Sequence, residues 1–568
     1  MNTAAWPAWD MSGLGPQLRG RESAKAMASC LRAARALAKT PLEKKNFPAL
    51  VDGYQEVLEQ LDRIAAVAEL RAAASAADPD TEALRQRVLK FQGRVKRALL
   101  PFELAWAKLG QARAAGLLVG LKDHPAGHGL AKARALGPYR LDQAREGLLA
   151  GVLEPVRSAW AAQWRELSGA VRAGGRLGLM AHPAPKTRAR AAKRLEAALR
   201  SQAGLFCRTL WGTVTAERLE DQARGYPHWL FPRAASEETT PEEVDRLTGQ
   251  IRQACHLAAG YYRLKAGLLG QEVLAGSDRL APPLPEKRLN FRAMSSLVLA
   301  GLGRISPELA DLAKVFFSQG RIDAGPRPGK VPGAFCRAVG QGDIPYIMLN
   351  ARGQARDAAV LAHELGHGLH HMLAADQGYI GCKPTLALAE AVAVCCELAL
   401  FEERLDRAET DRDRLLVLCQ RLEDDITTVF RQAVFHGFEH GLRGLEIMTA
   451  PDLAGLWLKT QDELCQGAVA GHDPNGWAVV PHFFLLPGYV NIYARAGCLA
   501  WAIWQRRPAM GCNFYPAFRG LLEAGGSKPL AELVAPFGLE PGHPDMGKIF
   551  FQAFATNLEQ ARDLSGLT

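Results

Sequence analysis

Long stretches of the chain repeat apolar residues at intervals of three and four positions, which is the spacing of one face of an α-helix. Two examples are ALVDGYQEVLEQLDRIAAVAELRAAASAA (49–77) and DTEALRQRVLKFQGRVKRALLPFELAWAKL (80–109). Both are dominated by residues that favour helices, such as Ala, Leu, Arg and Glu. The chain shows no repeat of fixed period and no low-complexity tract. It is therefore predicted to be mainly α.

One short region interrupts the helical pattern. GPRPGKVPGAFCRAVGQGDIPYIMLNARG (325–353) is rich in Gly and Pro and contains IPYIMLN (344–350), a run compatible with a β-strand. It stands directly before a histidine-rich segment, which indicates a small sheet at the wall of a site. An exposed edge of the 344–350 strand could pair with an extended peptide. A purely structural sheet is the alternative, and the sequence does not separate the two.

Segments rich in Pro and polar residues separate the helical stretches. YPHWLFPRAASEETTPEE (226–243) ends on the signature of a helix start, with a Thr cap, a Pro in the first turn and acids after it. Similar linkers lie at 123–129, 180–187 and 281–287.

The composition argues against several classes of protein. The net charge is +10, but basic stretches such as KTRARAAKR (186–194) have no interleaved aromatic residues to stack on bases, so we interpret them as solvated helix faces. Attraction of peptide carboxylates is a second use for this charge. No apolar run is long enough to span a membrane. The N-terminus does not resemble a signal peptide, and the 11 cysteines are odd in number and scattered, so we expect a cytoplasmic protein with reduced thiols.

The segment LAHELGHGLH (361–370) carries the strongest chemical signal. On a helix, His363 and His367 lie one turn apart on the same face, where both imidazoles can bind one Zn²⁺ at about 2.0–2.1 Å. Glu364 is rotated off that face and can serve as the general base toward water at the metal. A chance match on a histidine-rich surface helix is the alternative, but the helical context makes it the weaker interpretation.

A catalytic zinc needs a third protein ligand, and the next helical segment, TLALAEAVAVCCELALFEERL (385–405), offers one. Glu390 stands among apolar residues, where a carboxylate is almost never buried without a partner. Glu397 follows seven residues later on the same face and could hydrogen-bond a ligand histidine from behind. An ordinary solvated role for Glu397 is equally compatible with the sequence.

Other histidines carry weaker signals. His370 and His371 also invite interpretation as metal ligands. His370 faces roughly the same side as His363 but two turns along, and we assign it a supporting role or none. His436 and His440 in FHGFEHG have the spacing of metal ligands but no adjacent general base. We interpret that pair as structural or as support for a metal ligand.

HELGHGLH (363–370) followed by AEAVAVCCELAL (389–400) resembles the thimet oligopeptidase family of zinc peptidases, and more closely its oligoendopeptidase F branch. PGKVPGAFC (328–336), PYIMLN (345–350), FRQAVFHGFEH (430–440) and WAVVPHFFLLPGYVNIYARAG (477–497) also resemble segments of that family. The chain departs from the family pattern at Val331 and Pro332, and its PHFFLLPGYV appears one residue longer than usual.

The resemblance implies a large helical two-lobed body with a deep central channel and a small β-sheet next to the zinc helix. We expect an N-terminal helical lobe at 1–190 and a zinc-peptidase domain at 191–568. The implied metal ligands are His363, His367 and Glu390, holding one Zn²⁺ per chain, with Glu364, His482, Tyr489 and Tyr493 as catalytic residues. The implied substrate-binding residues are Gly333, Ala334, Tyr346, Ile347 and Met348. Without the resemblance, His482 and the two tyrosines would be interpreted as core aromatics with satisfied polar ends.

The predicted function is zinc-dependent hydrolysis of peptide bonds in short, unstructured oligopeptides. A dedicated processing peptidase for one precursor peptide is an alternative within enzymes. A non-catalytic helical peptide-binding protein with a structural zinc is an alternative outside them, although such a site is normally closed by a fourth protein ligand. Nucleic-acid binding is the weakest alternative, and the sequence leaves the oligomeric state open.

Overall fold

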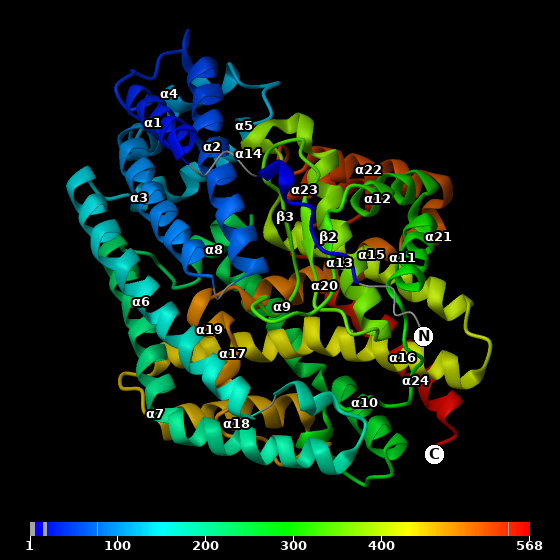
Figure 1. The fold of residues 1–568 in the computed structure, drawn as a ribbon. Helices are drawn as coiled ribbons and strands as arrows, with labels where there is room; N and C mark the ends of the chain where they lie inside the picture. The colour runs from blue at the N-terminus through cyan, green and yellow to red at the C-terminus, as the bar shows by residue number, and fades with distance from the viewer. Residues whose placement is uncertain (1–5, 15–19, 76–77, 176, 544, 568) are drawn as a thin grey trace. The chain divides into compact units, whose positions relative to one another are not determined.

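The computed structural model describes residues 6–14, 20–75, 78–175, 177–543 and 545–567. Helices dominate it and the strands are only two or three residues long, so the predicted mainly α class is confirmed (Figure 1). The chain divides into two units, each assembled from three separated segments. Unit 1 contains residues 1–147, 287–404 and 503–541, and unit 2 contains residues 148–286, 405–502 and 542–568. The lobes predicted on either side of residue 190 stay a prediction, and that boundary falls inside α7 (Pro185–Arg224).

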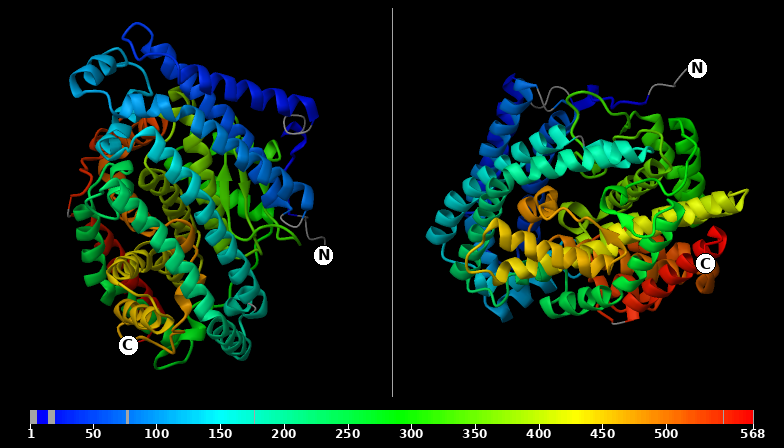
Figure 2. Two further views of the ribbon diagram at one scale, coloured as in Figure 1. Left: turned by 90° about the vertical axis from the view of Figure 1, so that its left-hand side faces the viewer. Right: turned by 90° about the horizontal axis from the view of Figure 1, so that it is seen from below.

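In unit 1 the N-terminal helices α1 (Gly20–Leu37), α2 (Phe47–Ala74) and α3 (Pro79–Ala107) pack on one another around a shared apolar core (blue in Figure 2). Asp78 caps α3 by accepting the backbone N–H of Asp80, and Pro79 occupies the first turn, where its missing N–H costs nothing. The other helices of the unit are α4 (Gln111–Val119), α5 (Gly127–Ala133), α11 (Phe291–Ile305), α12 (Pro307–Ser318), α13 (Ala355–Leu373), α14 (Gly378–Gly381), α15 (Leu386–Asp406), α21 (Arg507–Met510), α22 (Phe514–Ala524) and α23 (Leu530–Val534).

The sheet of unit 1 has three strands, β2 (Ile322–Asp323), β3 (Phe335–Arg337) and β4 (Tyr346–Met348), in the order β2-β4-β3. β4 pairs in parallel with β2 and antiparallel with β3. The expectation that residues 344–350 offer an exposed edge is therefore wrong, because β4 is the central strand and both of its edges are already paired. β3, which pairs with β4 on one side, is an edge strand.

The histidine-rich helix α13 packs closely against α15. A Cβ added at Gly366 on α13 would lie 2.8 Å from Cα of Ala393 and 3.1 Å from Sγ of Cys396, both on α15. Only a residue without a side chain allows two helices to approach so closely. On another face of α13, a Cβ at Gly368 would meet the ring of Phe316 at 2.5 Å. The glycines of the motif thus let α15 and α12 contact the helix directly.

Unit 2 is also helical and contains the predicted helix start at 240–243. Thr240 and Glu243 form a reciprocal capping box at α9 (Pro241–Gln253), which confirms that prediction. The basic segment 186–194 is not wholly solvated, because Arg188 is buried and donates to Asp278 at 2.7 Å. The remaining elements are α6 (Gln143–Gly175), α8 (Phe231–Ser236), α10 (Cys255–Leu268), β1 (Leu274–Ala275), α16 (Asp411–Asp425), α17 (Arg431–Gly444), α18 (Ala450–Cys465), β5 (Val469–Ala470), α19 (His482–Leu485), α20 (Val490–Trp504) and α24 (Asp545–Ser565). Among the described residues, no helix combines the length and apolarity required to cross a bilayer.

Candidate active site

The two histidines of the motif face the same side of α13, as their spacing predicts. Nε2 of His363 lies 3.1 Å from Nε2 of His367, and the two rings meet edge to face with centroids 4.7 Å apart. The helix begins at Ala355 with a capping box between Gln354 and Asp357. This start fixes the helix two turns before His363.

Glu390 of α15 brings a third donor to these two nitrogens. Its Oε2 lies 3.3 Å from Nε2 of His363 and 3.8 Å from Nε2 of His367. Ligands about 2.0–2.1 Å from a tetrahedral zinc ion lie about 3.3–3.4 Å apart, so the three donor atoms are spaced to share one ion. Two imidazoles and a carboxylate are also a donor set of catalytic zinc sites, which leave a position open for substrate. The residues present therefore fit a zinc ion.

Glu397 contacts the opposite side of His363. The N–H at Nδ1 of His363 donates to Oε1 of Glu397 at 2.7 Å. When the imidazole is neutral, this contact favours the proton on Nδ1 and leaves the Nε2 lone pair available on the side of His367 and Glu390. The geometry favours the supporting role for Glu397 over the solvated one.

Glu364 lies on the buried side of α13 and is only 6% exposed. Burial raises the pKa of its carboxyl to about 7, while the charge of His363 acts to lower it. A pKa near neutrality suits a group that must both take and give a proton. Glu364 is also close enough to Cys336 of β3 for its charge to help burial raise the pKa of that thiol. The edge strand thus lies near the candidate base.

The five predicted substrate-binding residues fall into two groups. Gly333, with φ of +97°, and Ala334 immediately precede the edge strand β3. Tyr346, Ile347 and Met348 form the buried central strand β4. The hydroxyl of Tyr346 donates to the backbone carbonyl of Asp10 at 3.3 Å.

The three predicted residues of the C-terminal region lie together in unit 2. The ring of His482 stacks on Tyr489 with centroids 5.7 Å apart and meets Tyr493 edge to face at 5.4 Å. The Tyr493 hydroxyl lies 3.4 Å from Nε2 of His482, and the two tyrosine rings are 5.2 Å apart. The rings form one cluster, and the guanidinium of Arg233 lies over Tyr489 at 5.7 Å.

Sequence reasoning missed Glu439 of α17. This buried carboxylate accepts the backbone N–H of Gly488 at 2.8 Å, directly before Tyr489. Burial raises its pKa to about 7. The sequence signal was a carboxylate among apolar and aromatic residues in VFHGFEH, the same signal that singled out Glu390.

Two of the other histidines stay outside the three-donor group. His370 is buried, and Nε2 of His371 lies 3.2 Å from the carbonyl oxygen of Gly340. The position of His370 is compatible with the supporting role or none.

Comparisons with known proteins agree with the fold and the motif. Residues 307–549 match the model of Peptidase family M3. The chain is 25% identical over 366 residues to Oligopeptidase PepF of Bacillus subtilis, which covers 63% of this chain and 54% of that protein. It is 27% identical over 374 residues to an oligoendopeptidase F homolog of Lactococcus lactis subsp. lactis, which covers 63% and 61%. The match thus spans less than two thirds of either relative.

Solved structures extend the comparison of the fold to nearly the whole chain. Oligoendopeptidase-F from Enterococcus faecium aligns with a TM-score of 0.71 at 20% identity, over 95% of this chain and 98% of that chain. PZ peptidase A with an inhibitor aligns with a TM-score of 0.80 at 15% identity, over 97% and 100%. At these identities the likeness shows a common fold.

Proposed function

We propose that the chain is a zinc-dependent oligopeptidase of peptidase family M3, in the oligoendopeptidase F branch. The match of residues 307–549 to the family model and the similarity to oligoendopeptidase F relatives support this proposal. The observation that carries the proposal is the convergence of His363, His367 and Glu390 beside a buried Glu364. The group contains three protein donors, the number typical of catalytic rather than structural zinc. The proposed substrates are short, unstructured peptides.

Each residue of the site has a separate role in the proposed reaction. A zinc ion held by His363, His367 and Glu390 would supply Lewis-acid polarisation of the scissile carbonyl. Glu364 takes a proton from the attacking water and later gives it to the leaving amine. Glu397 keeps His363 in the tautomer that leaves Nε2 available.

The sheet supplies a way to hold the substrate backbone. β3 is an edge strand that packs on α13, and Gly333 and Ala334 lead into it. An extended peptide that pairs with this edge is held through its backbone, which accommodates many sequences. Folded proteins do not present such a free extended segment. Tyr346, Ile347 and Met348 then support the edge strand from the centre of the sheet rather than bind the peptide themselves.

His482, Tyr489 and Tyr493 are the proposed donors to the developing oxyanion, with Tyr489 first and His482 assisting. Their mutual ring contacts restrict how each hydroxyl or imidazole can turn. Preorganised donors of this kind lower the barrier because they need no reorientation during the reaction. A cytoplasmic location is also proposed, and the structure pairs none of the described cysteines in a disulfide.

The test of the proposal is Glu364→Gln, assayed on a quenched fluorescent peptide with the zinc content measured in parallel. The variant should keep its zinc and lose about 10²–10⁴-fold in turnover, because only the proton acceptor has been removed. Asp376→Asn is the matched control, since it makes the same chemical change at an exposed position just beyond α13 and should leave turnover unchanged. Near-normal turnover in Glu364→Gln would refute the proposed role of this residue.

A further inference from the structure

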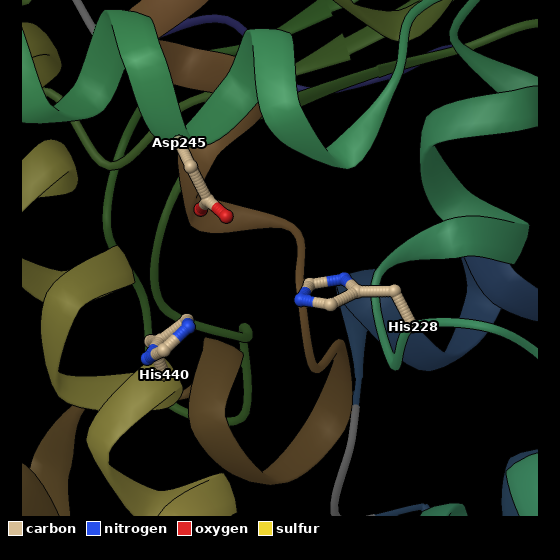
Figure 3. Close-up of side chains that lie close together, drawn as sticks. All are labelled: His228, Asp245 and His440. Carbon is tan, nitrogen blue, oxygen red and sulfur yellow. The ribbon is translucent and has the colours of Figure 1, made fainter.

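A second group of side chains of the types that ligate metals lies in unit 2 and has no part in the proposed reaction. His228 precedes α8, Asp245 lies on α9 and His440 lies on α17. Their donor atoms are all within 4.8 Å of one another. Figure 3 shows the two imidazoles and the carboxylate directed into one shared space. His228 and Asp245 lie near each other in the sequence, and the distant helix α17 adds His440, so three separate segments bring donors of the right kind together.

A fourth residue, His436, fixes the carboxylate in place. His436 lies one turn before His440 on α17 and is only 3% exposed, and its Nε2 lies 2.9 Å from Oδ1 of Asp245. Its ring also stacks on Trp229, the residue after His228, with centroids 5.9 Å apart. A ligating carboxylate that is itself hydrogen-bonded from behind is a regular feature of metal sites. His436 therefore orients Asp245 and leaves its second oxygen for a ligand.

We propose that His228, Asp245 and His440 form a second cation site, which takes a divalent transition-metal ion such as Zn²⁺. Two imidazole nitrogens and one carboxylate oxygen suit ions of this class, while Mg²⁺ and Ca²⁺ prefer oxygen alone. The site is partly open, since His440 is exposed and the Asp245 side chain is 42% exposed. Water completes the coordination of the ion.

Binding requires a local rearrangement that sets the affinity. The spacing of up to 4.8 Å is wider than the roughly 3.3–3.4 Å between ligands of a tetrahedral ion, so the three side chains must close on it. Nδ1 of His228 accepts the backbone N–H of Leu230 at 3.2 Å, whereas an imidazole that ligates through Nε2 carries its proton on Nδ1. The ion must displace this contact. The site is therefore expected to bind more weakly than the preformed group at His363.

Occupancy of this site would act on the turn that carries Tyr489. Trp229 and Leu230 follow His228 and form the wall against Gly488, where a Cβ would lie 3.2 Å from Leu230 Cδ1 and 3.3 Å from Trp229 Cζ3. An ion that draws His228 toward Asp245 would shift Trp229 and Leu230 or restrict their motion, and these two residues contact Gly488. This consequence rests on the proposed role of Tyr489, whereas binding of the ion does not.

The experiment is a calorimetric titration of the metal-free full chain with Zn²⁺. Wild type should show a tight and a weaker site, and the double variant His228→Ala/His440→Ala should lose the weaker one. His256→Ala, which removes an exposed histidine of unit 2 outside the group, is the matched control and should keep both. Asp245→Asn keeps an acceptor for His436 while removing the charged ligand, so it separates loss of the site from loss of the fold and should weaken the second site by at least 10-fold.

Two results would overturn the inference. One is a double variant that binds as many ions as wild type with the same affinities. The other is a wild-type chain in which the only site is lost on His363→Ala/His367→Ala. Failure of the proposed peptidase function gives a different pattern, in which the weaker site persists and responds to His228→Ala/His440→Ala although the chain cleaves no peptide.

Discussion

Replacing Gly366 by alanine tests whether the close approach of α13 and α15 sets the geometry of the proposed metal site. The added Cβ would lie 2.8 Å from Cα of Ala393, while ordinary contacts begin at 3.4 Å. The two helices must therefore separate locally by about 0.6 Å, the difference between those distances. Backbone cannot rotate away as a flexible side chain can, so the strain passes to the helices themselves. Glu390 lies one turn before Ala393 and moves with α15.

Two opposing terms decide the change in stability. Alanine in a helix interior is favoured over glycine by about 1 kcal/mol. Overpacking a filled interface typically costs about 1–3 kcal/mol, so the net change at Gly366 is expected to be a loss of up to about 2 kcal/mol. Gly93, in the interior of α3 of the same unit, is the matched control because no heavy atom would lie within 4 Å of its Cβ. Gly93→Ala should gain about 0.5–1 kcal/mol.

The metal affinity should respond more selectively than the stability. A site of this kind needs its ligands within about 0.5 Å of the productive geometry, and the shift at α15 is of that size. We expect Gly366→Ala to lose roughly 10-fold or more in zinc affinity, comparable to removal of a supporting contact, and Gly93→Ala to lose none. Zinc competition against a chromophoric chelator and thermal unfolding measure the two quantities. If Gly366→Ala matches wild type in both, the helix contact does not position Glu390.

Three further predictions address residues of the two units separately. Glu390→Ala should abolish zinc binding at the proposed site of His363, His367 and Glu390, while Glu397→Ala should weaken the zinc affinity by about 10–100-fold. The reverse order would mean that Glu397 is the ligand and Glu390 the supporting residue. Tyr489→Phe should lower turnover by roughly 10²–10³-fold with little change in KM and a near-normal melting temperature, and a defect confined to Tyr493→Phe would move the donor role to that residue. Burial raises the pKa of Glu439 from 4.5 to about 7, so the neutral form is favoured in the fold and this residue lowers the free energy of unfolding as the pH rises from about 4.5 to 7. Glu364 acts in the same direction, so Glu439→Gln should reduce the difference in unfolding free energy between pH 5 and pH 8 without abolishing it, and a difference equal to that of wild type would exclude a contribution from Glu439.

The parts of the site that follow from helix periodicity could be predicted from the sequence. Four-residue spacing puts His363 and His367 on one face, and seven-residue spacing does the same for Glu390 and Glu397, whatever surrounds the helices. The strand at 344–350 was recognised, but its place in the sheet was not. Its partner β2 is only two residues long and begins shortly after α12 ends at Ser318, so no local pattern predicts it. Which strand becomes an edge is decided by such tertiary pairing.

The surroundings of His436 and His440 could not be predicted from the sequence either, because their partners come from distant segments. The spacing of His436 and His440 was visible in the sequence, but the partner carboxylate, Asp245, is 191 positions away from His436. His228 lies in a linker whose sequence predicts a turn and nothing about its partners. The sequence does not show that His440 meets His228 and Asp245, because only the packing of the folded chain brings these three side chains together.

The two glutamates of α15 show how identical side chains come to do different chemistry. Glu390 and Glu397 share a helix face and both contact His363, but they reach opposite nitrogens of its ring: Glu390 lies near Nε2 and Glu397 near Nδ1. A neutral imidazole carries only one N–H. If Glu397 accepts the hydrogen bond from Nδ1–H, the lone pair is on Nε2, on the side of Glu390. In the proposed zinc site, Glu397 therefore prepares His363 as a ligand and Glu390 completes the set of ligands. The seven-residue spacing is what allows both, because it puts the carboxylates two helical turns, about 10.5 Å, apart along α15, so that the ring of His363 can lie between them.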